Sequence, residues 1–179
     1  YNCTGCHVVE GRGGDIRRLY EESPSLAPPI LNGEGEKVQA NWLFNFVKAP
    51  VPIRPWLKVR MPTFGLSDEE ANGVVGYFDN LDRVQVPYVH LALANLKADN
   101  VAAGKLLMSD DVLSCFSCHQ KGAQKPQGPP EGWAPDLALA AMRLNPDWIV
   151  KWIQDPQKLM PGTKMPSFYA DPENPDGPP

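Results

Sequence analysis

The sequence predicts a mainly helical fold with long loops and no substantial sheet, built from two homologous modules. Apolar residues recur at helical spacing, but only over short stretches. The 179 residues include 15 Gly and 20 Pro without a collagen period or a low-complexity run, which is typical of short helices joined by turning loops. The motifs of the first half also recur in the same order in the second half, and such a repeat changes the expected number of domains.

Composition and charge exclude several classes of protein. An apolar fraction of 42% is sufficient to build packed cores, so the chain is not a disordered tail. The net charge of −4, from 17 basic and 21 acidic residues, offers no basic footprint for nucleic acid, and none is expected as a partner. No run of about 18 apolar residues predicts a membrane span. A secretory signal is also absent, and because Tyr1 is an unusual first residue we expect a signal segment upstream of it.

The four cysteines form two C-x-x-C-H motifs, the signature of c-type haem attachment. The motif residues are Cys3, Cys6 and His7 in the first half and Cys115, Cys118 and His119 in the second. This spacing lets two thiols add across the two vinyl groups of one porphyrin, while the adjacent His reaches its iron as the proximal ligand. Two motifs therefore predict two covalently bound haem c groups.

The alternatives are a disulfide framework or a zinc site made of four thiolates. A zinc ribbon usually sets its two Cys pairs about 15–20 residues apart, whereas Cys115 lies 109 positions after Cys6. A His also follows each pair, which favours haem. Because thioether attachment takes place outside the cytoplasm, we expect a periplasmic protein or one on the extracytoplasmic face of the membrane.

Two helices are predicted in the first half. Residues 42–49 carry large apolar side chains on one stripe and precede Pro50. Residues 67–82 begin with Ser67 as a cap and with Glu70 at the capping-box position. The apolar stripe of this second helix consists of Ala71, Val74, Val75, Phe78 and Leu81.

Two further helices are predicted in the second half. Residues 99–110 contain Gly104 where a close helix crossing would need it. Residues 148–155 repeat the stripe of 42–49, and Asn145, Pro146 and Asp147 supply a cap, a first-turn proline and an acidic first turn.

The internal repeat defines the predicted domains. The matched segments are 27–30 with 134–137, 42–50 with 148–156, and 60–64 with 164–168. We therefore expect one domain over residues 1–88 and another over 89–179, joined near 84–97.

With these motifs, each half resembles a class I cytochrome c domain, and the pair resembles a dihaem cytochrome c of the tandem type. The resemblance implies two domains, each wrapped around one covalent haem. By motif, it carries the distal iron ligand onto Met61 in the first half and Met165 in the second. Met160 lies five residues before Met165 and also precedes a proline, so it stays open as the alternative. His90 could complete one bis-His haem at most, and its position between the domains favours a solvated side chain.

The resemblance also implies residues that support each haem. A proline carbonyl accepts the ring N–H of the proximal His in this family, and Pro28 and Pro135 match that position. Trp42 and Trp148 are expected to line the haem or the core.

The expected helix pairs are incomplete in both halves. The first module lacks the family's N-terminal helix, and the second lacks its C-terminal helix. Either the natural chain continues, or other subunits cover the exposed faces, or the helix at 67–82 packs on the helix at 99–110.

The function predicted from these features is a relay of single electrons between redox partner proteins, with no catalytic residue and no organic substrate. We expect a subunit of a respiratory or photosynthetic membrane complex; a cytochrome subunit of a periplasmic dehydrogenase and a dihaem peroxidase are the alternatives. Basic residues near the two methionines either steer an acidic partner or are solvated loop residues. They are Arg54, Lys58, Arg60, Lys158 and Lys164.

Overall fold

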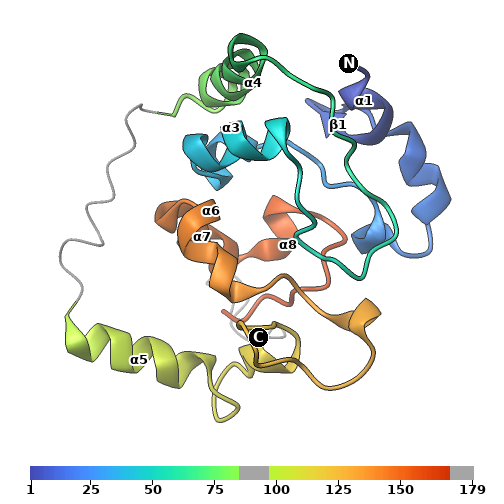
Figure 1. Ribbon diagram of the computed structural model, residues 1–179. Coiled ribbons are helices and arrows are strands. Elements are labelled where there is room, and N and C mark those ends of the chain that lie inside the picture. The colour runs from blue at the N-terminus through green and yellow to red at the C-terminus, as the bar shows by residue number, and fades with distance from the viewer. Residues whose placement is uncertain (85–96, 170–179) are drawn as a thin grey trace.

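The computed structural model describes residues 1–84 and 97–169, and this part of the chain is mainly helical (Figure 1). Its one ordered sheet is a hairpin in which β1 (Val8–Val9) pairs antiparallel with β2 (Arg12–Gly13). Glu10 and Gly11 form the turn with φ values of 50° and 75°, as a two-residue hairpin turn requires. The predicted absence of a substantial sheet therefore holds for the described residues.

Residues 1–84 contain four α-helices and two 3₁₀ helices. In chain order they are α1 (Cys3–Cys6), η1 (Asp15–Tyr20), η2 (Pro24–Leu26), α2 (Glu34–Lys37), α3 (Ala40–Lys48) and α4 (Asp68–Leu81). The predicted capping box of α4 is present, because the Ser67 side chain accepts from the Glu70 amide and the Glu70 carboxylate accepts from the Ser67 amide. Helix α3 ends two residues before Pro50, as its sequence predicts.

A hydrophobic core lies where α4 packs on α2 and α3. Its buried members all come from the first half: Val38, Leu43, Val47, Leu66, Ala71, Val75 and Phe78. Gly35 allows the close crossing of α2 and α4, because a Cβ there would lie 2.4 Å from the Phe78 carbonyl oxygen. The stripe predicted for α4 is thus the face that α2 and α3 bury.

The second half is built from short helices. They are α5 (Ala98–Met108), η4 (Cys115–Ser117), η5 (Pro130–Gly132), η6 (Leu137–Leu139), α6 (Ala140–Arg143), α7 (Pro146–Gln154) and α8 (Pro156–Leu159). Pro146 occupies the first turn of α7, as predicted. In the described part of the chain, none of these helices, nor any in the first half, has the length and apolar character needed to cross a bilayer.

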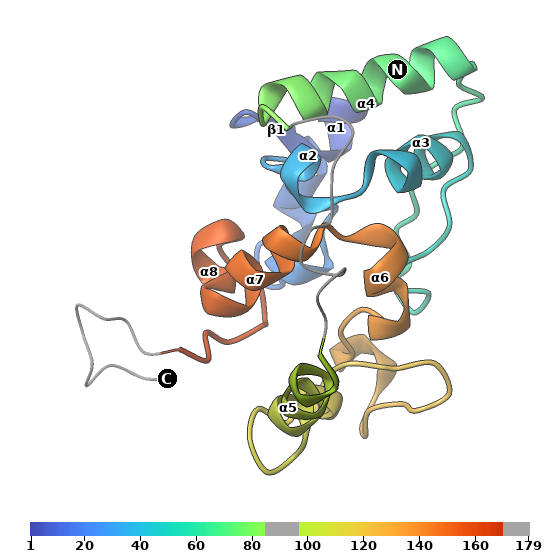
Figure 2. The same cartoon turned by 90° about the vertical axis from the view of Figure 1, so that its left-hand side faces the viewer.

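Helix α5 forms where a helix is predicted, but it does not pack on α4. The two helices lie at opposite ends of the molecule in both views (Figures 1 and 2). No residue of α5 is buried, and a Cβ on Gly104 would meet nothing within 4 Å. The hypothesis that the helices at 67–82 and 99–110 complete each other is therefore wrong, because α2 and α3 already cover the apolar face of α4.

Two pairs of helices recur at a constant separation in the chain. Helices α3 and α7 begin at Ala40 and Pro146 and end at Lys48 and Gln154, each pair 106 residues apart. The four-residue helices α2 and α6 keep the same separation. The separation of 106 residues that pairs Trp42 with Trp148 therefore holds upstream as far as α2 and α6.

The junction between α2 and α3, residues 37–39, contacts the equivalent junction between α6 and α7, residues 143–145. The contact is reciprocal. The backbone N–H of Gln39 donates to Arg143 O over 2.9 Å, and that of Asn145 donates to Lys37 O over 2.9 Å. Val38 and Leu144 form an antiparallel bridge between these bonds. Each segment therefore offers the other the same surface, as in an isologous interface.

The side chains at the two helix starts strengthen this contact. Gln39 Nε2 donates to Ala141 O and Leu144 O, both over 2.9 Å. Asn145 Nδ2 donates to Glu36 O over 2.8 Å and to Val38 O over 3.2 Å. Asn145 is the N-cap residue of α7, but its side chain makes no cap hydrogen bond, because it crosses to the first half instead.

The predicted boundary between residues 88 and 89 and the side chain of His90 lie outside the described residues.

Candidate haem attachment sites

Both C-x-x-C-H motifs form one tight turn of backbone. The first lies on α1 and the second begins with η4. In each motif the His amide donates to the carbonyl of the first Cys over 2.9 Å, from His7 to Cys3 and from His119 to Cys115. The same local fold therefore presents two thiols and an imidazole at both places.

All four cysteines are free thiols. Cys3 and Cys118 are exposed, whereas Cys6 and Cys115 are half-buried, and burial raises the pKa of the Cys115 thiol. Within residues 1–84 and 97–169, no three His, Cys, Asp or Glu side chains gather into a group that could hold a metal ion. The described residues thus contain neither the disulfide framework nor the zinc site of the alternative interpretations.

The ring of His119 is oriented by a proline carbonyl. His119 Nδ1 lies 2.8 Å from Pro135 O, and since a carbonyl only accepts, Nδ1 must carry the proton. This leaves Nε2 with its lone pair free for a metal. Burial lowers the pKa of His119, and the bond to Pro135 opposes this effect. Pro135 therefore lies where the resemblance placed it.

The ring of His7 is held in the same way by a different residue from the one predicted. His7 Nδ1 lies 2.8 Å from Pro29 O. The carbonyl of Pro28 instead accepts from Arg17 Nη1 over 2.6 Å. The expectation that Pro28 supports the proximal His is wrong by one residue.

The error arises because the two proline segments were matched at a separation of 107 residues, whereas the helices repeat at 106. The matching of 27–30 with 134–137 has a separation of 107, which pairs Pro28 with Pro135. In the structure, Leu31 N donates to Val8 O over 2.9 Å and Leu137 N donates to Gln120 O over 2.8 Å. Leu31 and Leu137 are 106 residues apart, and the same separation pairs Pro29 with Pro135. Keeping the register of the α3 and α7 segments without a shift would have found Pro29.

The predicted distal ligand of the first half lies between α3 and α4. Met61 is half-buried and packs against the hydrophobic core of the first half. The side chain is therefore supported by apolar packing.

The predicted distal ligand of the second half follows α8. Met165 is half-buried, and its Sδ accepts a hydrogen bond from Trp152 Nε1 over 2.8 Å. Gln157 Nε2 holds the backbone here, donating to Thr163 O over 2.7 Å and to Met165 O over 2.9 Å. Met160, the alternative, is the C-cap residue of α8. Trp152 was not singled out by the sequence, although it is the equivalent of Phe46 in the repeat.

The donor set at both motifs fits a covalent haem. Each offers two uncommitted thiols, an imidazole with a fixed tautomer and, in the same half of the chain, a half-buried thioether. Thiols add to porphyrin vinyl groups, and imidazole with thioether is an established axial pair for haem iron.

Trp42 and Trp148 lie at the contact between the two halves. Each stacks on the residue one turn later, with ring centroids 4.6 Å apart for Trp42 and Phe46 and 5.0 Å apart for Trp148 and Trp152. A cation from the opposite half covers each ring, with Arg143 over Trp42 at 5.1 Å and Lys37 over Trp148 at 5.9 Å. The two cations lie at equivalent positions, and no sequence motif marks either of them.

One member of the predicted basic surface is partly buried. Arg54 Nη1 donates to Ser25 O over 2.7 Å, and burial, with a smaller effect from Arg143, lowers the pKa of Arg54. Arg60 donates to the carbonyl of Pro55 over 2.6 Å and remains exposed. Arg54 is therefore a structural side chain and not a free charge for a partner.

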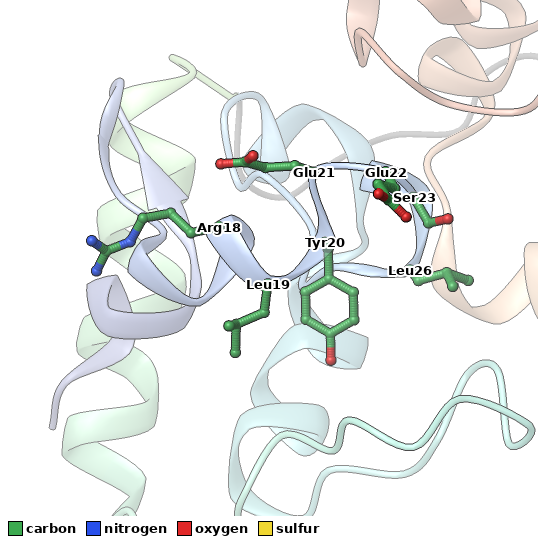
Figure 3. A pocket seen from close by; sticks show the side chains of 7 residues that line it. All are labelled: Arg18, Leu19, Tyr20, Glu21, Glu22, Ser23 and Leu26. Atoms are coloured by element: carbon green, nitrogen blue, oxygen red, sulfur yellow. The ribbon is translucent and has the colours of Figure 1, made fainter.

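A hollow of about 440 Å³ lies over η1 and η2, lined by residues 18–23 and Leu26 (Figure 3). Leu19 and Tyr20 point to the same side of the ribbon, whereas the Arg18 guanidinium points away from them. None of the predicted site residues lines this hollow.

Residues 1–82 match the family model described as Cytochrome c. No curated protein and no solved structure matches the chain. The family match supports a c-type cytochrome, an electron-transfer haem protein with covalently bound haem c. The mainly helical structure with little sheet fits a cytochrome c domain.

Proposed function

We propose, from the cytochrome c domain in residues 1–82, that the chain is a dihaem cytochrome that relays single electrons between redox partner proteins. In this proposal a second cytochrome c domain follows the first, and His7 with Met61 and His119 with Met165 would be the two pairs of residues that bind iron. The chain carries electrons and catalyses no reaction of its own.

The observation that carries the proposal is the matched pair of His–Pro hydrogen bonds. Both C-x-x-C-H motifs hold their His by an Nδ1–H to carbonyl bond of 2.8 Å, to Pro29 and to Pro135. A zinc or disulfide role would not require the same imidazole orientation twice. Such a hydrogen bond fixes the ring and raises its basicity as an iron ligand.

When bound, haem c supplies a centre that gains and loses one electron. In each half the two cysteines of the C-x-x-C-H motif would hold it through thioether bonds, and the oriented imidazole and the methionine thioether would be available to bind its iron. A thioether opposite an imidazole favours the reduced state and raises the potential.

The location and partners belong to the same proposal. Covalent attachment outside the cytoplasm supports a periplasmic protein or one on the extracytoplasmic face of a membrane. Partner proteins would be other subunits of a membrane-associated respiratory or photosynthetic complex.

The first test counts haems in the exported protein by intact mass and by the haemochrome spectrum. The expected result is two haems per chain, with one lost in the Cys115→Ala/Cys118→Ala variant and the other lost in Cys3→Ala/Cys6→Ala. The two variants are controls for each other, because each removes one motif and leaves the other intact. A wild-type chain with a single haem would contradict the dihaem assignment.

A second measurement tests the relay against the peroxidase alternative. If both irons are closed by methionine, cyanide and peroxide should leave the spectrum of the half-reduced protein unchanged. Binding of cyanide or peroxide to one haem would show that its iron has an open coordination position. This result would favour the peroxidase interpretation.

A further inference from the structure

The two halves carry different aromatic residues at one position of the repeat, and in the second half this residue contacts the predicted methionine ligand. Phe46 in α3 and Trp152 in α7 are 106 residues apart and occupy the same place in the two helices. Both rings stack on the tryptophan one turn earlier with the same interplanar angle of 17°. Because the stacking is the same, the difference between the two positions is chemical.

The chemical difference is one hydrogen-bond donor. Trp152 Nε1 donates to Met165 Sδ over 2.8 Å. Phe46 carries no polar atom and can offer nothing equivalent to Met61. A thioether sulfur has two lone pairs, so Met165 can accept the indole N–H with one and ligate iron with the other.

We propose that Trp152 tunes Met165 and makes the two haems unequal, with the second haem at the higher potential. This inference rests on the proposed function, because it takes Met165 as a haem ligand. A sulfur that shares a lone pair with an N–H donates less electron density to iron, and the oxidised iron needs this donation more. The hydrogen bond therefore favours the reduced state of the second haem.

The direction of internal transfer follows from this asymmetry. One electron leaves the reduced first haem and is gained by the oxidised second haem, with no bond broken and no proton moved. At equilibrium the single electron of the half-reduced protein resides mainly on the second haem. The chain then accepts electrons at the first half and delivers them from the second.

The backbone around Met165 is held by a residue other than Trp152. Gln157 Nε2 donates to Thr163 O and to Met165 O, over 2.7 Å and 2.9 Å, and so holds the backbone on both sides of Lys164. A phenylalanine at position 152 should also keep the stack on Trp148, since Phe46 stacks on Trp42 in the first half. Trp152→Phe is therefore expected to remove the donor without displacing the methionine.

The experiment is a redox titration of the dihaem protein. It is monitored through the weak long-wavelength absorption band of a ferric Met–thioether bond. Met61→His and Met165→His identify which potential belongs to which haem. Trp152→Phe is expected to lower the second potential and to move the electron distribution about 3- to 10-fold toward the first haem, the effect of losing one hydrogen bond. Ile153→Val, which trims the neighbouring half-buried residue of α7, is the matched control and should change neither potential.

Each other outcome decides a different point. Fewer than two haems in the wild type would contradict the proposed function itself. Two haems with no band at the second would show that Met165 is not its ligand and would overturn this inference alone. An unchanged second potential in Trp152→Phe, an equal shift in Ile153→Val, or loss of the second haem in Trp152→Phe would also overturn it.

Discussion

Gly35 shows how one residue decides the approach of two helices. Glycine there leaves room for α4 to cross α2, and the Asp82 carboxylate at the end of α4 accepts from the Gly35 amide over 2.7 Å. The glycine is needed for space and not for backbone freedom, because its φ is not in the left-handed region.

Gly35→Ala is expected to destabilise the protein by about 1–3 kcal/mol, the usual cost of overpacking. Its Cβ would lie 2.4 Å from Phe78 O and 2.7 Å from Phe78 C, so α2 and α4 would have to separate. Denaturant unfolding of the haem-loaded protein measures the change.

Gly73→Ala is the control for this prediction. Gly73 lies in α4, and a Cβ added there would meet nothing within 4 Å, so alanine should stabilise the helix by about 0.5–1 kcal/mol. Equal effects of the two alanines would contradict the close crossing at Gly35.

At the scale of the element, α4 is anchored at its start by hydrogen bonds to one carboxylate, that of Glu70. Ser67 and Glu70 exchange the two capping-box hydrogen bonds, and Tyr1 Oη donates to Glu70 Oε1 over 3.0 Å. The Glu70 carboxylate therefore joins the start of α4 to the residue two places before Cys3. This contact brings the first haem motif to the helix that closes the core.

The anchoring predicts a dependence of stability on acid pH. Two hydrogen bonds lower the pKa of Glu70 below its ordinary value of 4.5. The bond from the Ser67 amide has the larger effect, and the bond from the Tyr1 hydroxyl has the smaller one. The contribution of the ionised carboxylate is therefore complete above about pH 4.5 and is lost as the pH falls through the lower pKa of the folded state. Glu70→Gln should be less stable than the wild type at neutral pH, with the difference shrinking in acid.

Glu69→Gln is the matched control, because Glu69 is exposed in the same first turn of α4 and lies outside the capping box. Unfolding curves from pH 3 to pH 7 would test both variants. A loss in Glu70→Gln that persisted unchanged in acid would show that the charge is not responsible.

The elements were largely predictable from the sequence, whereas their contacts were not. Helices α3, α4, α5 and α7 lie within two residues of their predicted bounds, because apolar period, Ser67 and the following prolines are local signals. The His–Pro bonds are not local, and the loops before the two prolines differ in length, so Pro28 and Pro29 could be told apart only by register. The N–H bond from Trp152 to Met165 depends on tertiary approach and has no sequence signal beyond the repeat.

At the scale of the whole molecule, the contact between the two halves includes a set of polar hydrogen bonds at the starts of α3 and α7. Asn145 is at its centre, 2% exposed, and its amide reaches the carbonyls of Glu36 and Val38. Sequence reasoning assigned this residue as a helix cap because its type and position are typical of one. In the structure its side chain instead donates to carbonyls of the first half.

Asn145→Ala is expected to lower the free energy of unfolding by about 1–3 kcal/mol, because it leaves buried carbonyls of the first half without their donor. Asn72→Ala, at an exposed position of α4, should change stability by less than about 0.5 kcal/mol. Thermal unfolding of both variants measures the difference. A loss in Asn145→Ala no larger than that in Asn72→Ala would show that the contact adds nothing to stability.

The reciprocal contact between the two halves should not depend on the concentration of the protein. Separate copies of a protein that pair through identical surfaces come apart on dilution, because their encounter is bimolecular. Here the two surfaces belong to one polypeptide, so each meets the other at an effective concentration on the order of millimolar, set by the connecting chain. The contact of residues 37–39 with residues 143–145 should therefore survive at any dilution of the protein, and the segments that carry Pro29 and Pro135 should keep their relative position from one molecule to the next.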